Sequence, residues 1–169
     1  MSLDEFMQVI RVDLGGSFNT LRLAAADMAK QEPLDDGSRG LIINVASGAA
    51  FDGVPQAVPY SAAKGGVVAM TLALAREFGD LAIRVMTISP GAMRTPMSET
   101  LPEIIWEEVP KHIPFPSRFA EPGEFADLVL SICKCTYLNG ETIRLDGAQR
   151  MPYKFLFQLE TENNELWGQ

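Results

Sequence analysis

Apolar residues in two segments recur at three- and four-residue intervals, a spacing that predicts amphipathic helices. Residues 3–30 follow this period, with Ser2 as a candidate N-cap and Glu5 three residues later as its partner in a capping box. Residues 60–78 are rich in Ala, Leu and Met and end at Gly79, a residue favoured just past a helix. We therefore expect one long helix at each segment.

Short apolar or β-branched runs separate these helices and are typical of buried parallel strands. They lie at residues 41–45, 83–88 and 141–145. Pro122 suits the first turn of a third helix that runs to about Cys133. The proline-rich segment 90–120 is predicted to be an irregular flap that carries a short helix near 102–112. Flaps of this kind usually cover a substrate site.

The order of these elements is helix, strand, helix, strand, helix, strand. Such alternation predicts a parallel sheet with helices on its faces, which is an α/β architecture. We expect residues 1–152 to form one unit of this kind. Residues 153–169 place aromatic residues among acids and amides without a clear period, so they are interpreted as a tail of unknown conformation.

Composition limits the function classes. The chain has 169 residues, 47% of them hydrophobic, and a net charge of −8, which disfavours nucleic acid and anionic membranes as partners. No continuous apolar run approaches the roughly 20 residues of a membrane span. Cys133, Cys135 and His112 provide neither a zinc set nor a disulfide framework, so we expect no metal site and an intracellular, reducing compartment.

Ser47, Tyr60 and Lys64 form the most informative constellation. Ser47 directly follows a predicted strand, and Tyr60 and Lys64 are four residues apart at the start of a predicted helix, so they share one face. A phenol ionises near pH 10, and a neighbouring ammonium favours the ionised form, which makes a phenol useful for proton transfer. A tyrosine at a helix start more often only packs, but the serine and its strand context favour alcohol and ketone chemistry.

Four short motifs occur here in the order and spacing of the short-chain dehydrogenase/reductase family. They are residues 44–47, 60–64, 83–85 and 89–91. The chain resembles that family over about residues 3–152. The segments 95–96, 114–118 and 138–147 are particularly similar to its 3-hydroxyacyl-CoA and 17β-hydroxysteroid dehydrogenases. The resemblance implies part of a Rossmann-like doubly wound sheet, without the N-terminal strands that bind the dinucleotide.

The resemblance also implies a set of site residues. Ser47, Tyr60 and Lys64 would be catalytic, while Tyr60, Lys64, Pro90, Gly91 and Thr95 would bind the cofactor. NAD is the implied cofactor, and a secondary alcohol of the 3-hydroxyacyl-CoA or hydroxysteroid type is the implied substrate. Copies of the chain would associate through the helices at 3–30 and 60–78. A mitochondrial location is one of the intracellular alternatives.

Two features depart from the family pattern. Asp13 stands where the family has a fourth catalytic residue, an asparagine, and the sequence holds no Gly-x-Gly-x-x-Gly turn for the pyrophosphate. Three interpretations stay open. The chain is an oxidoreductase that needs the missing half, or a non-catalytic oligomerisation or interaction module, or a truncated gene product that binds no cofactor alone.

Overall fold

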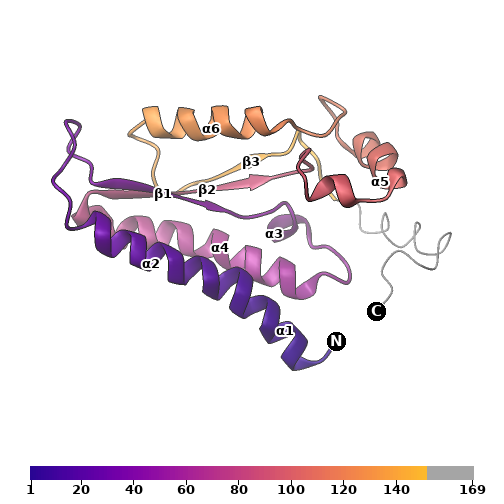
Figure 1. Ribbon diagram of the computed structural model, residues 1–169, viewed down its shortest axis with the longest axis horizontal. Helices are drawn as coiled ribbons and strands as arrows, with labels where there is room; N and C mark the ends of the chain where they lie inside the picture. Colours follow the sequence, from indigo (N-terminus) through magenta and orange to yellow (C-terminus); the bar gives the residue numbers. More distant parts are fainter. Residues whose placement is uncertain (152–169) are drawn as a thin grey trace.

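The computed structural model describes residues 1–151, and its chain folds into three layers with a parallel sheet in the middle (Figure 1). The sheet contains β1 (Gly40–Val45), β2 (Ile83–Pro90) and β3 (Thr142–Leu145), all parallel and in the order β1-β2-β3. This confirms the predicted α/β fold class. The predicted tail at 153–169 lies outside the described residues.

The first predicted helix forms, but it is not uniform. It consists of α1 (Leu3–Val9), a π-helical turn η1 (Ile10–Gly15) and α2 (Gly16–Met28). Ser2 and Glu5 make the expected capping box. The π-helical turn was not predicted. It separates α1, which packs against α4 (Val58–Glu77), from α2, which packs against β1.

The remaining helical elements include those predicted near 102–112 and from Pro122, and three short ones that were not predicted. They are α3 (Ala49–Asp52), η2 (Gly79–Leu81), η3 (Ser98–Thr100), α5 (Glu103–Glu108), η4 (Val109–His112) and α6 (Pro122–Lys134). The flap therefore carries α5 and η4 where one short helix was predicted. The unpredicted α3 is a single turn between Gly48 and Gly53, too short to show a period.

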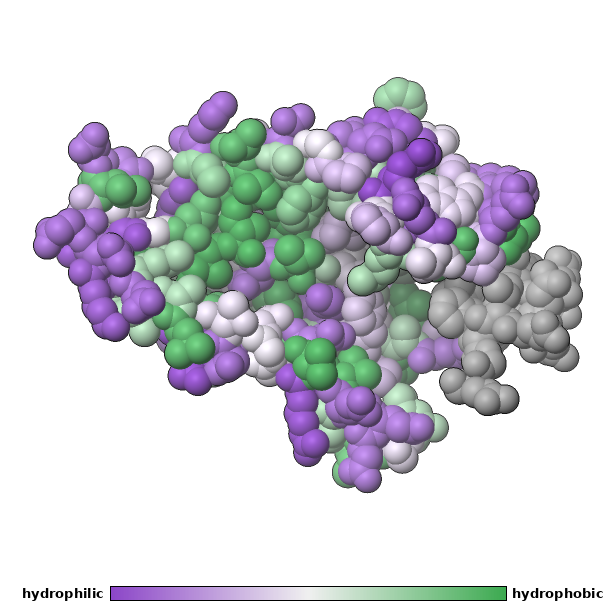
Figure 2. Space-filling model, viewed as in Figure 1, coloured by the Kyte–Doolittle hydropathy of each residue, from purple (hydrophilic) through white to green (hydrophobic). Residues whose placement is uncertain are grey.

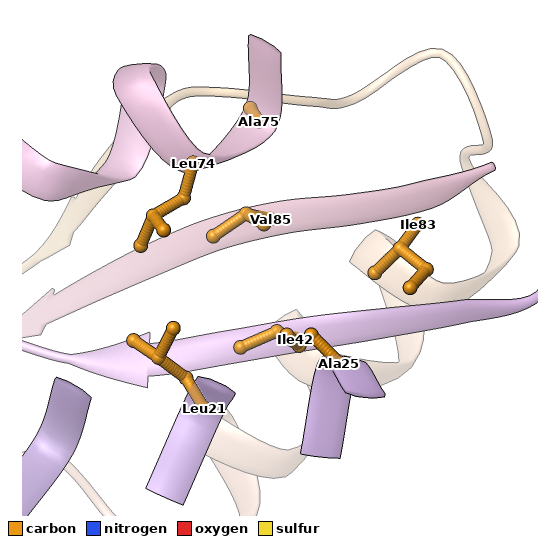
Figure 3. Packing of buried hydrophobic residues seen from close by; sticks show 7 residues of the cluster. All are labelled: Leu21, Ala25, Ile42, Leu74, Ala75, Ile83 and Val85. Carbon is orange, nitrogen blue, oxygen red and sulfur yellow. The ribbon is translucent and has the colours of Figure 1, made fainter. Parts of the chain in front are cut away.

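Alternate residues of each strand face opposite layers, and each layer has its own apolar cluster. Figure 3 shows the cluster between the sheet, α2 and α4, which contains Leu21, Ala25, Ile42, Leu74, Ala75, Ile83 and Val85. On the other face, Met86 and Ile88 of β2 meet Ile132 of α6, and all three are fully buried. Together the two clusters fix the sheet between the helices, so the ends of the strands form a rigid support.

α4 is long and apolar enough to cross a membrane by length and composition, although the sequence has no long uninterrupted apolar run. In the fold this helix lies against the sheet, with its buried stripe facing β1 and β2. That stripe includes Ala63, Val67 and Leu74. Packing of this kind is sufficient to explain the apolar composition of α4 in an α/β layer.

β1 forms an open edge of the sheet. A groove of about 430 Å³ runs beside it, lined by α2 residues such as Leu21 and by residues 41–45 of the strand. Figure 2 shows apolar side chains gathered on this face of the molecule, between α6 and α2. Val45, the last residue of the strand, is 46% exposed. An open, apolar strand edge is a surface on which further chain can add.

Candidate active site

The candidate catalytic residues lie at the carboxyl edge of the sheet, where ligands bind in open α/β folds. Ser47 follows β1, while Tyr60 and Lys64 lie in the first turns of α4. The Lys64 ammonium donates to the Val45 carbonyl oxygen at 3.2 Å and lies 5.7 Å from the centroid of the Tyr60 ring. Lys64 therefore links the end of β1 to the tyrosine.

The Ser47 side chain is held by the helix that follows it. Its Oγ accepts a hydrogen bond from the Ala49 N–H at 3.2 Å, so the hydroxyl keeps its own proton for donation. Ser47 is half-buried, and Tyr60 is 38% exposed. Both hydroxyl groups can therefore reach a molecule bound over the sheet edge.

Pro90 and Gly91, at the end of β2, stand beside this group. The Gly48 N–H donates to the Pro90 carbonyl at 3.4 Å, which joins the two strand ends. Thr95 lies in the flap, where its hydroxyl oxygen accepts a hydrogen bond from the Ser98 N–H at 3.2 Å. Pro90 and Gly91 thus lie with Ser47 at the ends of two strands, while Thr95 is bonded within the flap. The sequence has no glycine-rich turn of the kind that fits the pyrophosphate of a dinucleotide.

Asp13 lies in the π-helical turn η1, on the side of the fold that packs against α4. Its neighbour Leu14 approaches Gly66 so closely that a Cβ on Gly66 would lie 2.8 Å from a Leu14 methyl carbon. Ser17 Oγ donates to the Asp13 backbone carbonyl at 2.6 Å. π-helical turns are frequent at functional sites. The turn that carries Asp13 therefore packs against α4 at Gly66, which is two residues after Lys64.

An ion network at the same edge was not foreseen from the sequence. Arg144 of β3 makes a bidentate pair with Asp52 of α3, at 2.8 and 2.9 Å, and a third bond to Asp146 at 2.6 Å. The hydrogen bonds from Arg144 lower the pKa of Asp52, although burial opposes this shift. Asp52 and Arg144 are separated by 92 positions in the sequence, which explains why no local pattern indicated the pair.

Acid should weaken this network. A carboxyl whose pKa is lowered by folding stabilises the protein above its unfolded pKa, and this contribution is lost as the pH falls through the folded pKa. We expect the free energy of unfolding of Asp52→Asn to lie further below that of the wild type at about pH 7 than at about pH 2.5. Urea unfolding at both pH values measures this difference. A difference that does not change with pH would contradict the assignment, and Asp27→Asn, in an exposed pair, is the control.

Gly91 allows β2 to end against the turn after β3. A Cβ on this residue would lie 2.8 Å from the Asp146 Cβ and 2.9 Å from its Cα. Since one of these atoms is backbone, we expect Gly91→Ala to lower the free energy of unfolding by about 1–3 kcal/mol, the usual cost of overpacking. Gly123→Ala is the matched control, because a Cβ there meets nothing within 4 Å and α6 gains helix propensity. Equal stability of the two variants would refute the close approach.

Within residues 1–151, no group of His, Cys, Asp and Glu side chains could hold a metal ion. The candidate site consists of the Ser47 hydroxyl, the Tyr60 phenol and the Lys64 ammonium, beside the ends of β1 and β2. Such groups can hold a substrate oxygen and move a proton to or from it.

Comparison with known proteins connects this chain to a family. The family model for short chain dehydrogenases matches residues 1–105. The 3-hydroxyacyl-CoA dehydrogenase type-2 of Bos taurus is 50% identical over 150 residues, which are 89% of this chain and 58% of that protein. The crystal structure of 3-hydroxyacyl-CoA dehydrogenase type-2 from Mycobacterium avium superposes with a TM-score of 0.86 at 41% identity, over 89% of this chain and 58% of that one.

A second solved structure, a 3-oxoacyl-[acyl-carrier protein] reductase with bound NAD from Brucella melitensis, has a TM-score of 0.74 at 32% identity. It covers 90% of this chain and 54% of that one. The chain thus spans somewhat more than half the length of these relatives. A fold and a sequence that match over nine-tenths of the chain lead to one conclusion: the chain belongs to the short chain dehydrogenase family of oxidoreductases.

Proposed function

We propose that this chain provides the catalytic part of a nicotinamide-dependent oxidoreductase that interconverts a secondary alcohol and a ketone. The observation that carries the proposal is the contact of Lys64 with both the end of β1 and the Tyr60 ring, next to Ser47. The substrate class is 3-hydroxyacyl-CoA or a hydroxysteroid, by similarity to relatives named as 3-hydroxyacyl-CoA dehydrogenases.

In the direction of reduction, the Tyr60 phenol gives its proton to the substrate oxygen as the ketone becomes an alcohol. The Ser47 hydroxyl donates a hydrogen bond to the same oxygen and stabilises the charge that develops there. The Lys64 ammonium lies 5.7 Å from the centroid of the Tyr60 ring and places a cationic group beside the site of proton transfer. A bound nicotinamide cofactor would supply the hydride in this direction and would take it up in the other.

Lys64, Pro90, Gly91 and Thr95 would hold the nicotinamide end of the cofactor. A bound NAD in the Brucella melitensis reductase supports this choice of cofactor. Asp13 would take the place of the family's asparagine, where its carboxylate can accept a hydrogen bond but lacks the amide donor. We expect proton delivery along this route to be less efficient than with an asparagine.

Two further parts of the proposal concern the state of the protein. Copies of the chain associate through α1–α2 and α4, whose surfaces expose Val12, Phe18 and Leu72 at 45–66%. Buried against a second copy, such side chains would leave water. The compartment is intracellular and reducing, since Cys133 and Cys135 are both free and exposed.

Titration of the purified chain with NADH and with NADPH, followed by nicotinamide fluorescence, tests the proposal together with the mass in solution. Saturable binding followed by oxidation of NADH with a 3-ketoacyl-CoA is the expected result. If no binding occurs up to millimolar cofactor in any oligomeric state, the chain alone is not a dehydrogenase. Stable self-association without binding would instead favour the non-catalytic module.

A further inference from the structure

We propose that Arg144 is a positioning residue for Ser47, through its ion pair with Asp52. This inference rests on the proposed function of Ser47. Arg144 belongs to β3, and Ser47 follows β1, so the two residues lie at opposite sides of the three-stranded sheet. The Arg144 side chain bridges this distance to Asp52, and the short helix α3, which ends at Asp52, connects the ion pair to Ser47.

The Arg144 side chain connects the carboxyl ends of the outer strands. Arg144 is paired in register with Ser89 of β2, so both side chains lie on the face of the sheet that α4 covers. From β3 its guanidinium reaches Asp52, which follows β1, and makes two parallel hydrogen bonds. It thus extends past the end of β2, where Pro90 and Gly91 stand.

The network is also compact and shielded from solvent. The side chains of Arg144, Asp52 and Asp146 are 18%, 7% and 6% exposed. Arg144 donates a further bond to the Gln149 carbonyl, and Asp52 accepts one from the Met151 N–H at 3.0 Å. A guanidinium that serves two carboxylates and a carbonyl uses the fork of donors that lysine lacks.

α3 carries the effect from Asp52 to Ser47. This helix has only four residues, so hydrogen bonds within it cannot hold it in place alone. Its first N–H, from Ala49, binds Ser47 Oγ, and its last, from Asp52, donates to the Gly48 carbonyl at 3.0 Å. Fixing the Asp52 carboxylate therefore fixes the peptide that orients the serine hydroxyl.

The ion pair also lies directly against the residue after Ser47. A Cβ on Gly48 would be 3.6 Å from Arg144 Nη2 and 3.7 Å from Asp52 Oδ2, which is van der Waals contact. The backbone next to the serine thus rests on the paired charges. Loss of the guanidinium would leave the Asp52 carboxylate without its main partner and would release this support.

Two substitutions of Arg144 test the inference in the full chain. Arg144→Met removes the ion pair, while Arg144→Lys keeps the charge and can restore only part of the bonding. Amide hydrogen exchange reports on position without requiring activity. We expect exchange at Ala49, Asp52 and Met151 to rise by at least about tenfold in Arg144→Met and by less in Arg144→Lys, while Val85 in the core stays unchanged.

Steady-state kinetics provide the second measurement. We expect kcat of Arg144→Met to fall by roughly 10- to 100-fold, as for a misplaced catalytic group, with KM for NADH close to the wild-type value. Arg39→Met is the matched control. The Arg39 side chain donates to the Gln31 carbonyl at the amino end of β1, far along the sheet from the site, so exchange at Ala49 and kcat should not change.

Two results would overturn the inference: exchange at Ala49 that matches the Arg39→Met control, or exchange that rises equally at Val85, which would indicate only a loss of global stability. If Arg144→Met does not fold, Asp52→Asn tests the same contact without an unpaired carboxylate. If the unsubstituted chain shows no turnover, the proposed function fails, and the exchange comparison still decides the position of Ser47.

Discussion

Tyr60→Phe is expected to lower kcat by about 10²- to 10⁴-fold, the usual contribution of a general acid or base. The variant keeps the ring that lies 5.7 Å from the Lys64 ammonium and loses only the hydroxyl that exchanges a proton with the substrate. Cofactor affinity should therefore change little. Oxidation of NADH with a 3-ketoacyl-CoA measures kcat, and fluorescence titration measures binding.

Tyr137→Phe makes the same chemical change on the surface. Tyr137 follows α6 and is 99% exposed, so this variant should retain wild-type turnover. Turnover by Tyr60→Phe within a factor of about three of the wild-type rate would assign the proton transfer to another group. Loss of binding with loss of turnover would instead show that the phenol serves mainly to hold the cofactor.

Ile132→Ala should cause the largest loss of stability among single substitutions in α6. Ile132 is fully buried between α6 and the sheet, where it contacts the cluster of Met86 and Ile88. Removing three carbons from such a site costs the lost apolar burial and leaves a cavity. We expect the free energy of unfolding to fall by about 2–5 kcal/mol in urea titrations.

Leu130→Ala provides the comparison on the same helix. Leu130 is 54% exposed, so the substitution removes little buried surface and introduces a better helix former. Its free energy of unfolding should stay within about 0.5 kcal/mol of the wild type. If the two variants lost equal stability, α6 would not be docked on the sheet through the face described.

The layers of the fold could be predicted because their signals are local. The runs at 41–45 and 83–88 became adjacent strands, and the helix at 60–78 begins within two residues of its predicted start. Ser47 and Tyr60 could be connected for a related reason. Ser47 follows a strand and Tyr60 lies at the start of the next long helix, and a strand end and the following helix start lie at the same edge of a parallel sheet.

The other features depend on contacts between distant segments. The pair of Arg144 and Asp52 has no sequence signal, because Arg144 alternates with Ile143 and Leu145 like any polar strand residue. Cys133 is a second example, because it lies on the predicted helix α6 but its side chain is exposed and not part of the core. A helical period locates a face only approximately, and packing decides which residues it buries.

The π-helical turn η1 has a consequence for insertions and deletions in the first helix. α1 packs on α4, and α2 packs on β1. The apolar face of α1 and the apolar face of α2 must therefore keep a fixed angle to each other about the helix axis. Each α-helical residue advances this angle by about 100°. A π-helical turn holds about one residue more than an α-helical turn, so a one-residue deletion within Ile10–Gly15 is absorbed by α-helical winding, whereas a one-residue insertion there turns α1 by about 100° away from α4. In this helix, residue spacing therefore determines docking as strictly as residue type.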